Sequence, residues 1–158
     1  MKKLLCVFLC GILMFSLPGC SIEEAFGSAV FLFLAATGDD RAEKEDIFTF
    51  VTENRDDLLR CIEENDHSAF EGHKIIQSIT VNTDHVDYDC GGAGVGSGTS
   101  YRGFFYSSEG DMTAPWCIQT GAKLTASGAG FEWQESSGDN WYYVEMICEG
   151  FYYYEASF

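Results

Sequence analysis

The sequence EKEDIFTFVTENRDDLLRCIEE, residues 43–64, has the strongest helical pattern in the chain. Its apolar side chains recur at helical spacing and fall within about 120° of one another on a helical wheel. They are Ile47, Phe48, Val51, Leu58, Leu59 and Ile62. Asp40 followed by Glu43 resembles a capping box, which marks the start of a helix. We therefore expect one long amphipathic helix over residues 43–64.

After Gly72 the apolar residues change from helical spacing to alternate positions, the pattern of half-buried strands. Strands are expected over residues 74–81, 85–90, 101–107, 129–134, 141–149 and 151–155. Because a helix precedes successive antiparallel strands, the predicted fold class is α+β, with the long helix packed on a curved antiparallel sheet of about five strands. A cystatin-like arrangement is one candidate for this fold.

The first twenty residues differ in composition from the rest of the chain. Lys2 and Lys3 precede an apolar run that ends in Leu17-Pro18-Gly19-Cys20. This segment resembles the signal and lipobox of a bacterial lipoprotein, although Pro18 stands where a lipobox usually has a small or β-branched residue. The resemblance implies cleavage before Cys20, acylation of that cysteine with a lipid such as palmitate, and a lipid anchor on the extracytoplasmic face of the cell membrane.

A second apolar stretch, from Ile22 to Ala36, follows the lipobox. As a helix it would rise about 22 Å, less than the roughly 30 Å of a hydrocarbon core. It is either a first helix buried in the domain or a segment that lies against the lipid surface beside the anchor. The expected organisation is a signal peptide at 1–19, an acylated apolar segment at 20–40 and one domain at 41–158.

The chain is strongly acidic, with 25 acidic and 9 basic residues and a net charge of −16. Removal of residues 1–19 takes away Lys2 and Lys3 but no acidic residue, which leaves a net charge of −18. Such a chain is repelled by the phosphates of nucleic acids. The expected partners are the membrane, through the lipid anchor, and an envelope protein or a cell-wall glycan, but no nucleic acid.

Four of the seven cysteines lie beyond the signal and the acylation site: Cys61, Cys90, Cys117 and Cys148. An even number of cysteines in an exported domain predicts two disulfides, and the pairing stays open. Their spacings of 29, 27 and 31 residues contain no CxxC, which disfavours a zinc site.

No segment has the spacing of a catalytic or cofactor motif. The glycine-rich residues 91–98 lack the Lys-Ser or Lys-Thr of a phosphate loop and are expected to be a flexible connection. An oxygen-rich cluster precedes them, at Asp84, His85, Asp87 and Asp89. It lacks the spacing of a calcium loop, and on a strand its last three members share one face, which we expect to be exposed. The sequence therefore predicts neither a metal ion nor a cofactor.

Aromatic residues gather in the second half of the chain, where 15 of the 24 lie between residues 101 and 158. Adjacent side chains of a strand face opposite ways, so consecutive aromatic residues cannot all enter one core. They either form ordinary cross-strand pairs or supply a platform for a sugar or peptide. The candidate platform residues are Tyr101, Trp133, Trp141, Tyr143, Tyr152 and Tyr154.

The stretch from Cys90-Gly91-Gly92 through residues 101–107 is similar to a pattern in small uncharacterised lipoproteins and secreted proteins of Gram-positive gut bacteria, which implies an envelope location and no particular activity. The predicted function is a membrane-anchored, non-catalytic binding domain. Two alternatives stay open. One is a cell-wall-directed hydrolase that uses paired carboxylates such as Asp87, Asp89 or Glu145. The other is a protease-inhibitor-like domain with protruding hairpin loops.

Overall fold

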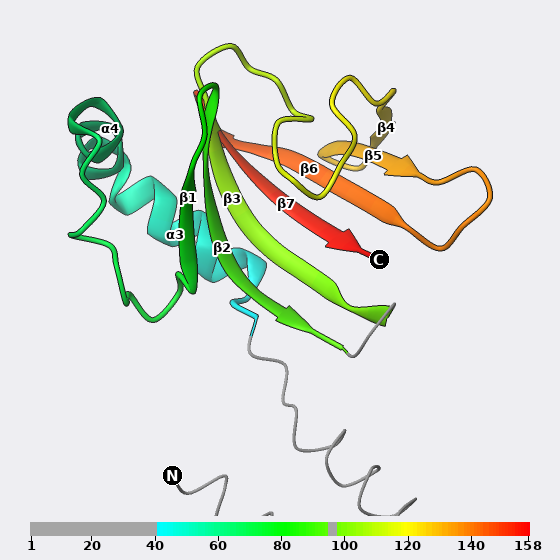
Figure 1. The fold of residues 1–158 in the computed structure, drawn as a ribbon, viewed down its shortest axis with the longest axis horizontal. Helices are drawn as coiled ribbons and strands as arrows, with labels where there is room; N and C mark the ends of the chain where they lie inside the picture. Colours follow the sequence, from blue (N-terminus) through cyan, green and yellow to red (C-terminus); the bar gives the residue numbers. More distant parts are fainter. Residues whose placement is uncertain (1–40, 95–97) are drawn as a thin grey trace, which may run out of the picture. The chain divides into compact units, whose positions relative to one another are not determined.

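The computed structural model describes residues 41–94 and 98–158 (Figure 1). Two helices, α3 (Lys44–Glu53) and α4 (Arg55–Glu64), come first. Seven strands follow: β1 (Ser78–Val81), β2 (His85–Ala93), β3 (Ser100–Ser107), β4 (Thr125–Ser127), β5 (Gly130–Gln134), β6 (Trp141–Cys148) and β7 (Phe151–Ser157). The predicted signal peptide, Cys20 and the apolar segment 20–40 lie outside the described residues. Neither α3 nor α4 is long and apolar enough to cross a membrane.

Asn54 divides the predicted helix of residues 43–64 into two helices of ten residues each. Its backbone N–H and its side-chain amide both donate to the Phe50 carbonyl, at 3.0 and 2.8 Å. Side-chain bonds of this kind compete with the regular helical ladder. The chain turns at Asn54, and α4 leaves the direction of α3 (Figure 1). The prediction of one long helix is therefore wrong.

The strands form one open antiparallel sheet of seven strands in the order β1-β2-β3-β7-β6-β5-β4. The prediction of about five strands, and with it the cystatin-like arrangement, is wrong. The first strand begins at Ser78 rather than Lys74. A further short strand, β4, lies in a segment without an alternating pattern. β1 and β4 form the two edges of the sheet.

Strand β7 is the central strand of the sheet. The chain turns back at Gly150, so β7 pairs with β6 on one side, and β3 pairs with it on the other. Gly150 has φ +82°, a backbone conformation that other residues rarely adopt. A Cβ at this position would lie 2.6 Å from the Tyr106 ring. The glycine turn thus places the aromatic run 151–154 in the middle of the sheet, with alternate side chains on its two faces.

One face of the sheet, here called the helix face, packs on α3 and α4 (Figure 1). Tyr88 and Phe104 stack there, with ring centroids 4.5 Å apart and planes 7° apart. Burial of each large apolar side chain is worth about 1.5–3 kcal/mol, which holds the helices on the sheet. The principal members of this core are Ile47, Phe50, Val51, Leu58, Val86, Tyr88, Phe104, Phe151 and Tyr153.

The opposite face, here called the loop face, is covered by residues 108–124, the cover segment, which connects β3 to β4. Thr113 fixes the shape of this segment, because its hydroxyl donates to Asp111 and accepts from the Gly121 N–H, both at 2.8 Å. The core below it consists of Phe105, Cys117, Ile118, Tyr142, Val144, Tyr152, Tyr154 and Ala156. The central strands β3 and β7 are therefore buried on both faces, whereas the edge strands β1 and β4 are largely exposed.

The cover segment overturns the expectation that His85, Asp87 and Asp89 form an exposed polar face. Alternation along β2 does place all three on one face of the sheet, away from Tyr88. However, Asp87 is only 3% exposed, and His85 and Asp89 are half-buried. Polar residues on a strand predict a solvated face only where nothing packs over it.

Candidate functional site

The six aromatic residues of the predicted platform do not form one surface. Tyr152 and Tyr154 lie in the core of the loop face, where they are 4% and 0% exposed, so they cannot reach a partner. The other four are half-buried. Tyr101 and Trp133 lie on the loop face, and Trp141 and Tyr143 lie on the helix face.

The most exposed tryptophan is Trp116 of the cover segment, at 59% exposure. Its ring centroid lies 5.1 Å from that of Tyr101, edge to face, and 5.9 Å from that of Phe158. Tyr101 and Phe158 are also in contact, with centroids 6.5 Å apart. These three residues, the Trp116 cluster, form an aromatic surface at the end of the sheet where β3 begins and β7 ends.

The backbone holds Trp116 rigidly at this surface. Its neighbours Pro115 and Cys117 are both buried, and the Ile118 N–H donates to the Pro115 carbonyl at 3.3 Å. With the residues on both sides fixed in the core, the backbone at Trp116 has little freedom left to lose on binding. Rigid, exposed aromatic side chains are the usual anchors of binding surfaces.

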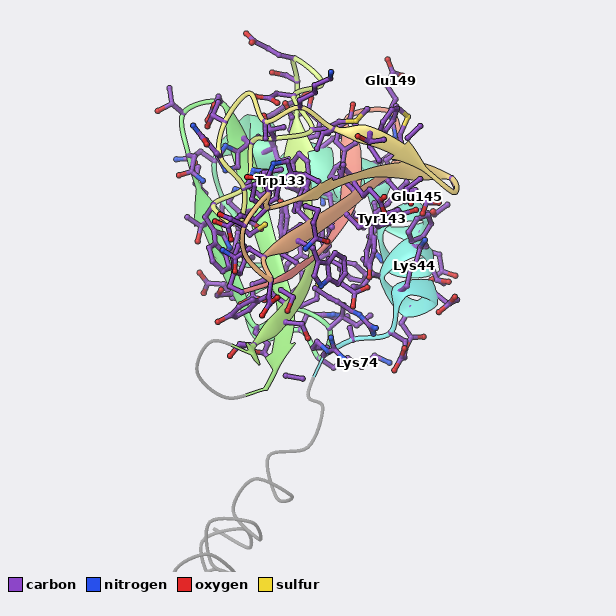
Figure 2. The ribbon with its side chains drawn as sticks, turned by 90° about the vertical axis from the view of Figure 1, so that its right-hand side faces the viewer. Lys44, Lys74, Trp133, Tyr143, Glu145 and Glu149 are labelled. Carbon is purple, nitrogen blue, oxygen red and sulfur yellow. The ribbon has the colours of Figure 1, made fainter. Side chains whose placement is uncertain are left out.

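A second aromatic arrangement lies on the helix face, around the ammonium group of Lys44. The Nζ atom is 5.3 Å from the ring centroids of Phe48, Tyr143 and Tyr153. It also contacts the Glu145 carboxylate. Figure 2 shows Lys44 on α3 beside Tyr143 and Glu145 of β6. We call these four residues around Lys44 the Lys44 cage.

Hydrogen bonds fix the carboxylate of the cage. The Tyr143 hydroxyl donates to Glu145 Oε2 at 2.7 Å. Burial alone would raise the pKa of Glu145, but the bonds from Lys44 and Tyr143 outweigh it and hold that pKa below its ordinary value. Burial and the adjacent carboxylate raise the pKa of Tyr143 to about 12. At neutral pH the cage therefore holds a carboxylate and a neutral phenol.

Two further cations lie beside the cage, but each has its own carboxylate. Arg102 Nη1 is 3.3 Å from Glu43, and Arg102 Nε is 3.2 Å from Glu155. Arg41 also contacts Glu155, at 3.5 Å. The charges of the two arginines are thus balanced by Glu43 and Glu155, and Lys44 is the one cation among the described residues that is paired with Glu145.

Asp87 is the most unusual carboxylate among the described residues. Its Oδ1 accepts a hydrogen bond of 3.1 Å from the Tyr154 hydroxyl, whereas its buried Oδ2 has no partner. Burial raises the pKa of Asp87 to about 6. Glu145, the other carboxylate considered for hydrolysis, lies on the opposite face of the sheet. The two do not form a catalytic pair, and Asp87 faces a core rather than a cleft.

The four domain cysteines are free thiols in this structure. Cys61 and Cys90 lie in the helix-face core, and Cys148 packs against it, whereas Cys117 lies in the loop-face core. A disulfide from Cys117 to Cys61 or Cys90 would have to cross the sheet. Burial raises the pKa of the Cys90 and Cys117 thiols, which disfavours the reactive thiolate. The pairing into two disulfides stays a prediction.

Sequence reasoning missed both the Trp116 cluster and the Lys44 cage. Lys44 and Phe48 are four residues apart on one helix, a spacing that brings side chains together. Tyr143 and Glu145 occupy alternate positions of one strand and so share a face. The sequence indicates that the members of each pair lie close together. It does not indicate the strand order that brings the two pairs into contact.

Within residues 41–94 and 98–158, no group of three or more His, Cys, Asp and Glu side chains is placed to hold a metal ion. No family model matches the chain, and comparisons with curated proteins and with solved structures give no significant match.

Proposed function

We propose that this chain is a lipid-anchored protein of the extracytoplasmic membrane face whose domain binds a partner and does no chemistry itself. The observation that carries the binding role is the Trp116 cluster, an exposed aromatic surface on a rigid backbone. The partner is a cell-wall glycan or an envelope protein. A sugar ring or an apolar side chain fits this surface, because the indole offers a flat apolar face with one polar N–H at its rim.

The charge of the whole chain supports the same class of partner. A net charge of −16 disfavours nucleic acids and other polyanions, whereas a neutral or cationic partner meets no repulsion. The hydrolase alternative lacks support in the described residues. Asp87 and Asp89 share the loop face, but Asp87 is only 3% exposed and faces a core rather than a cleft, and Glu145 lies on the opposite face of the sheet. A small, rigid aromatic surface is sufficient for binding, since a few central aromatic residues carry most of the energy of an interface.

Trp116→Ala is expected to lower recovery of the partner by roughly thirtyfold, because truncation of an aromatic anchor typically removes about 2 kcal/mol of binding energy. The measurement is crosslinking of the full-length protein in intact cells, followed by identification and quantification of the attached protein or wall fragment.

Met146→Ala is the matched control, since Met146 is 52% exposed but lies on β6, outside the Trp116 cluster. This variant should recover as much partner as the wild type. Equal recovery from the Trp116 and Met146 variants would contradict binding at the cluster.

The lipid anchor has its own test. Mass spectrometry of the mature N-terminus should find an acylated Cys20 as the first residue, and Cys20→Ala should release the protein from the membrane fraction. Two acyl chains suffice for stable anchoring, whereas a single chain binds only marginally. An unmodified Cys20 in the mature chain would contradict the anchor while leaving the binding surface untouched.

A further inference from the structure

We propose that the Lys44 cage is a binding site for a small organic quaternary ammonium group, and that Lys44 is its displaceable internal occupant. The proposal goes beyond the binding surface around Trp116, because the cage lies on the opposite face of the sheet. It rests on four features of the cage: its rings, its fixed carboxylate, its hydrogen-bonding capacity and its access to solvent.

Three rings line the cage on one side of the Lys44 ammonium group. Phe48 comes from α3, Tyr143 from β6 and Tyr153 from β7, and each centroid lies 5.3 Å from Lys44 Nζ. A cation within about 6 Å of an aromatic centroid is attracted by the negative face of the ring. Rings arranged in this way form the aromatic cages that recognise quaternary ammonium ligands.

The Glu145 carboxylate of the cage keeps its position without Lys44. The Tyr143 hydroxyl donates to Glu145 Oε2 at 2.7 Å, and this bond remains if the lysine side chain swings out. Because Arg41 and Arg102 are balanced by Glu155 and Glu43, departure of Lys44 leaves Glu145 as an unbalanced carboxylate facing three rings. The emptied cage is therefore preorganised for one positive charge.

A quaternary ammonium suits the cage better than the lysine does. A lysine ammonium has three N–H donors and is strongly hydrated. Among the described residues, Glu145 is the one hydrogen-bond acceptor for Lys44. A quaternary ammonium has no N–H donor, so it loses less hydration when it enters the cage and keeps the attraction of the rings and the carboxylate.

The cage opens to solvent. The Lys44 side chain is 36% exposed, so it can leave without unfolding of the domain. Beside Phe48, the outer side of α3 presents an open surface formed by Thr49, Thr52 and Glu53, over which the remainder of a ligand can lie.

The test uses the full-length protein in detergent and its Lys44→Ala variant, with tetramethylammonium chloride as the probe and sodium chloride at equal ionic strength as the reference. Lys44→Ala should bind the probe at least about tenfold more tightly than the wild type, because a tethered competitor has been removed. The readout is a saturable NMR shift of the Tyr143 and Tyr153 ring protons.

Variants in the Lys44→Ala background separate the features of the cage. Glu145→Gln should weaken binding at least about tenfold, because it removes a charge in direct contact with the cation. Phe48→Leu should weaken it about fivefold through loss of one ring, and it leaves the hydrogen bond from Tyr143 to Glu145 in place. Trp116→Ala should have no effect, so failure of this proposal is distinguishable from failure of the Trp116 surface. Tert-butanol, a neutral molecule of similar shape, should not bind.

A second readout covers the case in which Lys44→Ala does not fold. In the wild type, tetramethylammonium should expose Lys44 and increase its acylation by an amine-reactive reagent, with Lys123 as the internal reference. Choline and phosphatidylcholine vesicles then distinguish a free cation from a lipid headgroup. The absence of a ring shift in folded Lys44→Ala, or equal labelling of Lys44 with and without the probe, would overturn the proposal.

Discussion

Gly103→Ala is expected to destabilise the domain by at least about 3 kcal/mol, at the upper end of what overpacking of a core costs. Gly103 lies in the middle of β3, between β2 and β7. A Cβ there would lie 2.5 Å from the Tyr88 carbonyl oxygen, 2.6 Å from the Tyr154 hydroxyl and 2.7 Å from Tyr154 Cε1. Atoms cannot approach so closely, and one of these neighbours is backbone.

The collision would also break a buried hydrogen bond. Tyr154 is fully buried, and its hydroxyl reaches Asp87 through the space left by the missing side chain of Gly103. Displacement of the ring would leave both oxygens of the Asp87 carboxylate without a partner, and an unpaired buried polar group costs about 1–3 kcal/mol or more. The strain and the lost bond act together.

Urea denaturation of the wild type and the variant measures this effect. Gly98→Ala is the matched control, because a Cβ at Gly98 would meet nothing within 4 Å. The control should unfold at nearly the same urea concentration as the wild type, whereas Gly103→Ala should unfold much earlier or not fold at all. Similar midpoints for both glycine variants would show that β3 can shift to accept the side chain.

Local patterns in the sequence located most of the strands. Alternation of apolar residues placed strands close to the observed β2, β3, β5, β6 and β7, because each has one set of side chains in a core. The break at Asn54 was missed because the apolar side chains continue at helical spacing on both sides of it. That spacing indicates which residues pack against the core, but it does not indicate where the backbone hydrogen bonds of a helix are interrupted. The three-residue strand β4 is too short to show any period.

The features that the sequence did not predict depend on contacts between residues far apart in the chain. Alternation correctly put Tyr152 and Tyr154 on one face, but it does not tell which face another segment will cover. The cover segment has no regular period, so its burial of Asp87 was not foreseen. The Lys44 cage joins α3 to β6 and β7, and its assembly depends on β7 lying between β3 and β6.

We expect the free energy of unfolding of the wild type to fall as the pH rises from 4 to 7, and we expect Asp87→Asn to abolish this fall. In the folded chain the pKa of Asp87 is about 6, above its ordinary value of 3.8. Between these two values the folded state binds more protons than the unfolded state, so the free energy of unfolding falls as pH rises. The stabilisation is complete below about pH 4 and disappears as pH passes 6.

The groups around Asp87 are consistent with this direction. Burial is the largest influence and raises the pKa, whereas the Tyr154 hydroxyl on β7 and His85 on the same strand lower it. Asp89, on the same face of β2, raises it further, and the buried Cys117 of the cover segment brings no compensating cation. Because Asp87 is 3% exposed, water screens these influences little.

A shift of about two pKa units corresponds to about 3 kcal/mol, so the stability of the wild type relative to Asp87→Asn should fall by roughly 2–3 kcal/mol between pH 4 and pH 7. Urea denaturation at several pH values measures both proteins. Asp139→Asn removes the same charge from an exposed turn, so it corrects for the general repulsion in this acidic chain and should parallel the wild type. If Asp87→Asn also parallels the wild type, Asp87 keeps its ordinary pKa in the folded chain, and water must then reach its carboxylate beneath the cover segment.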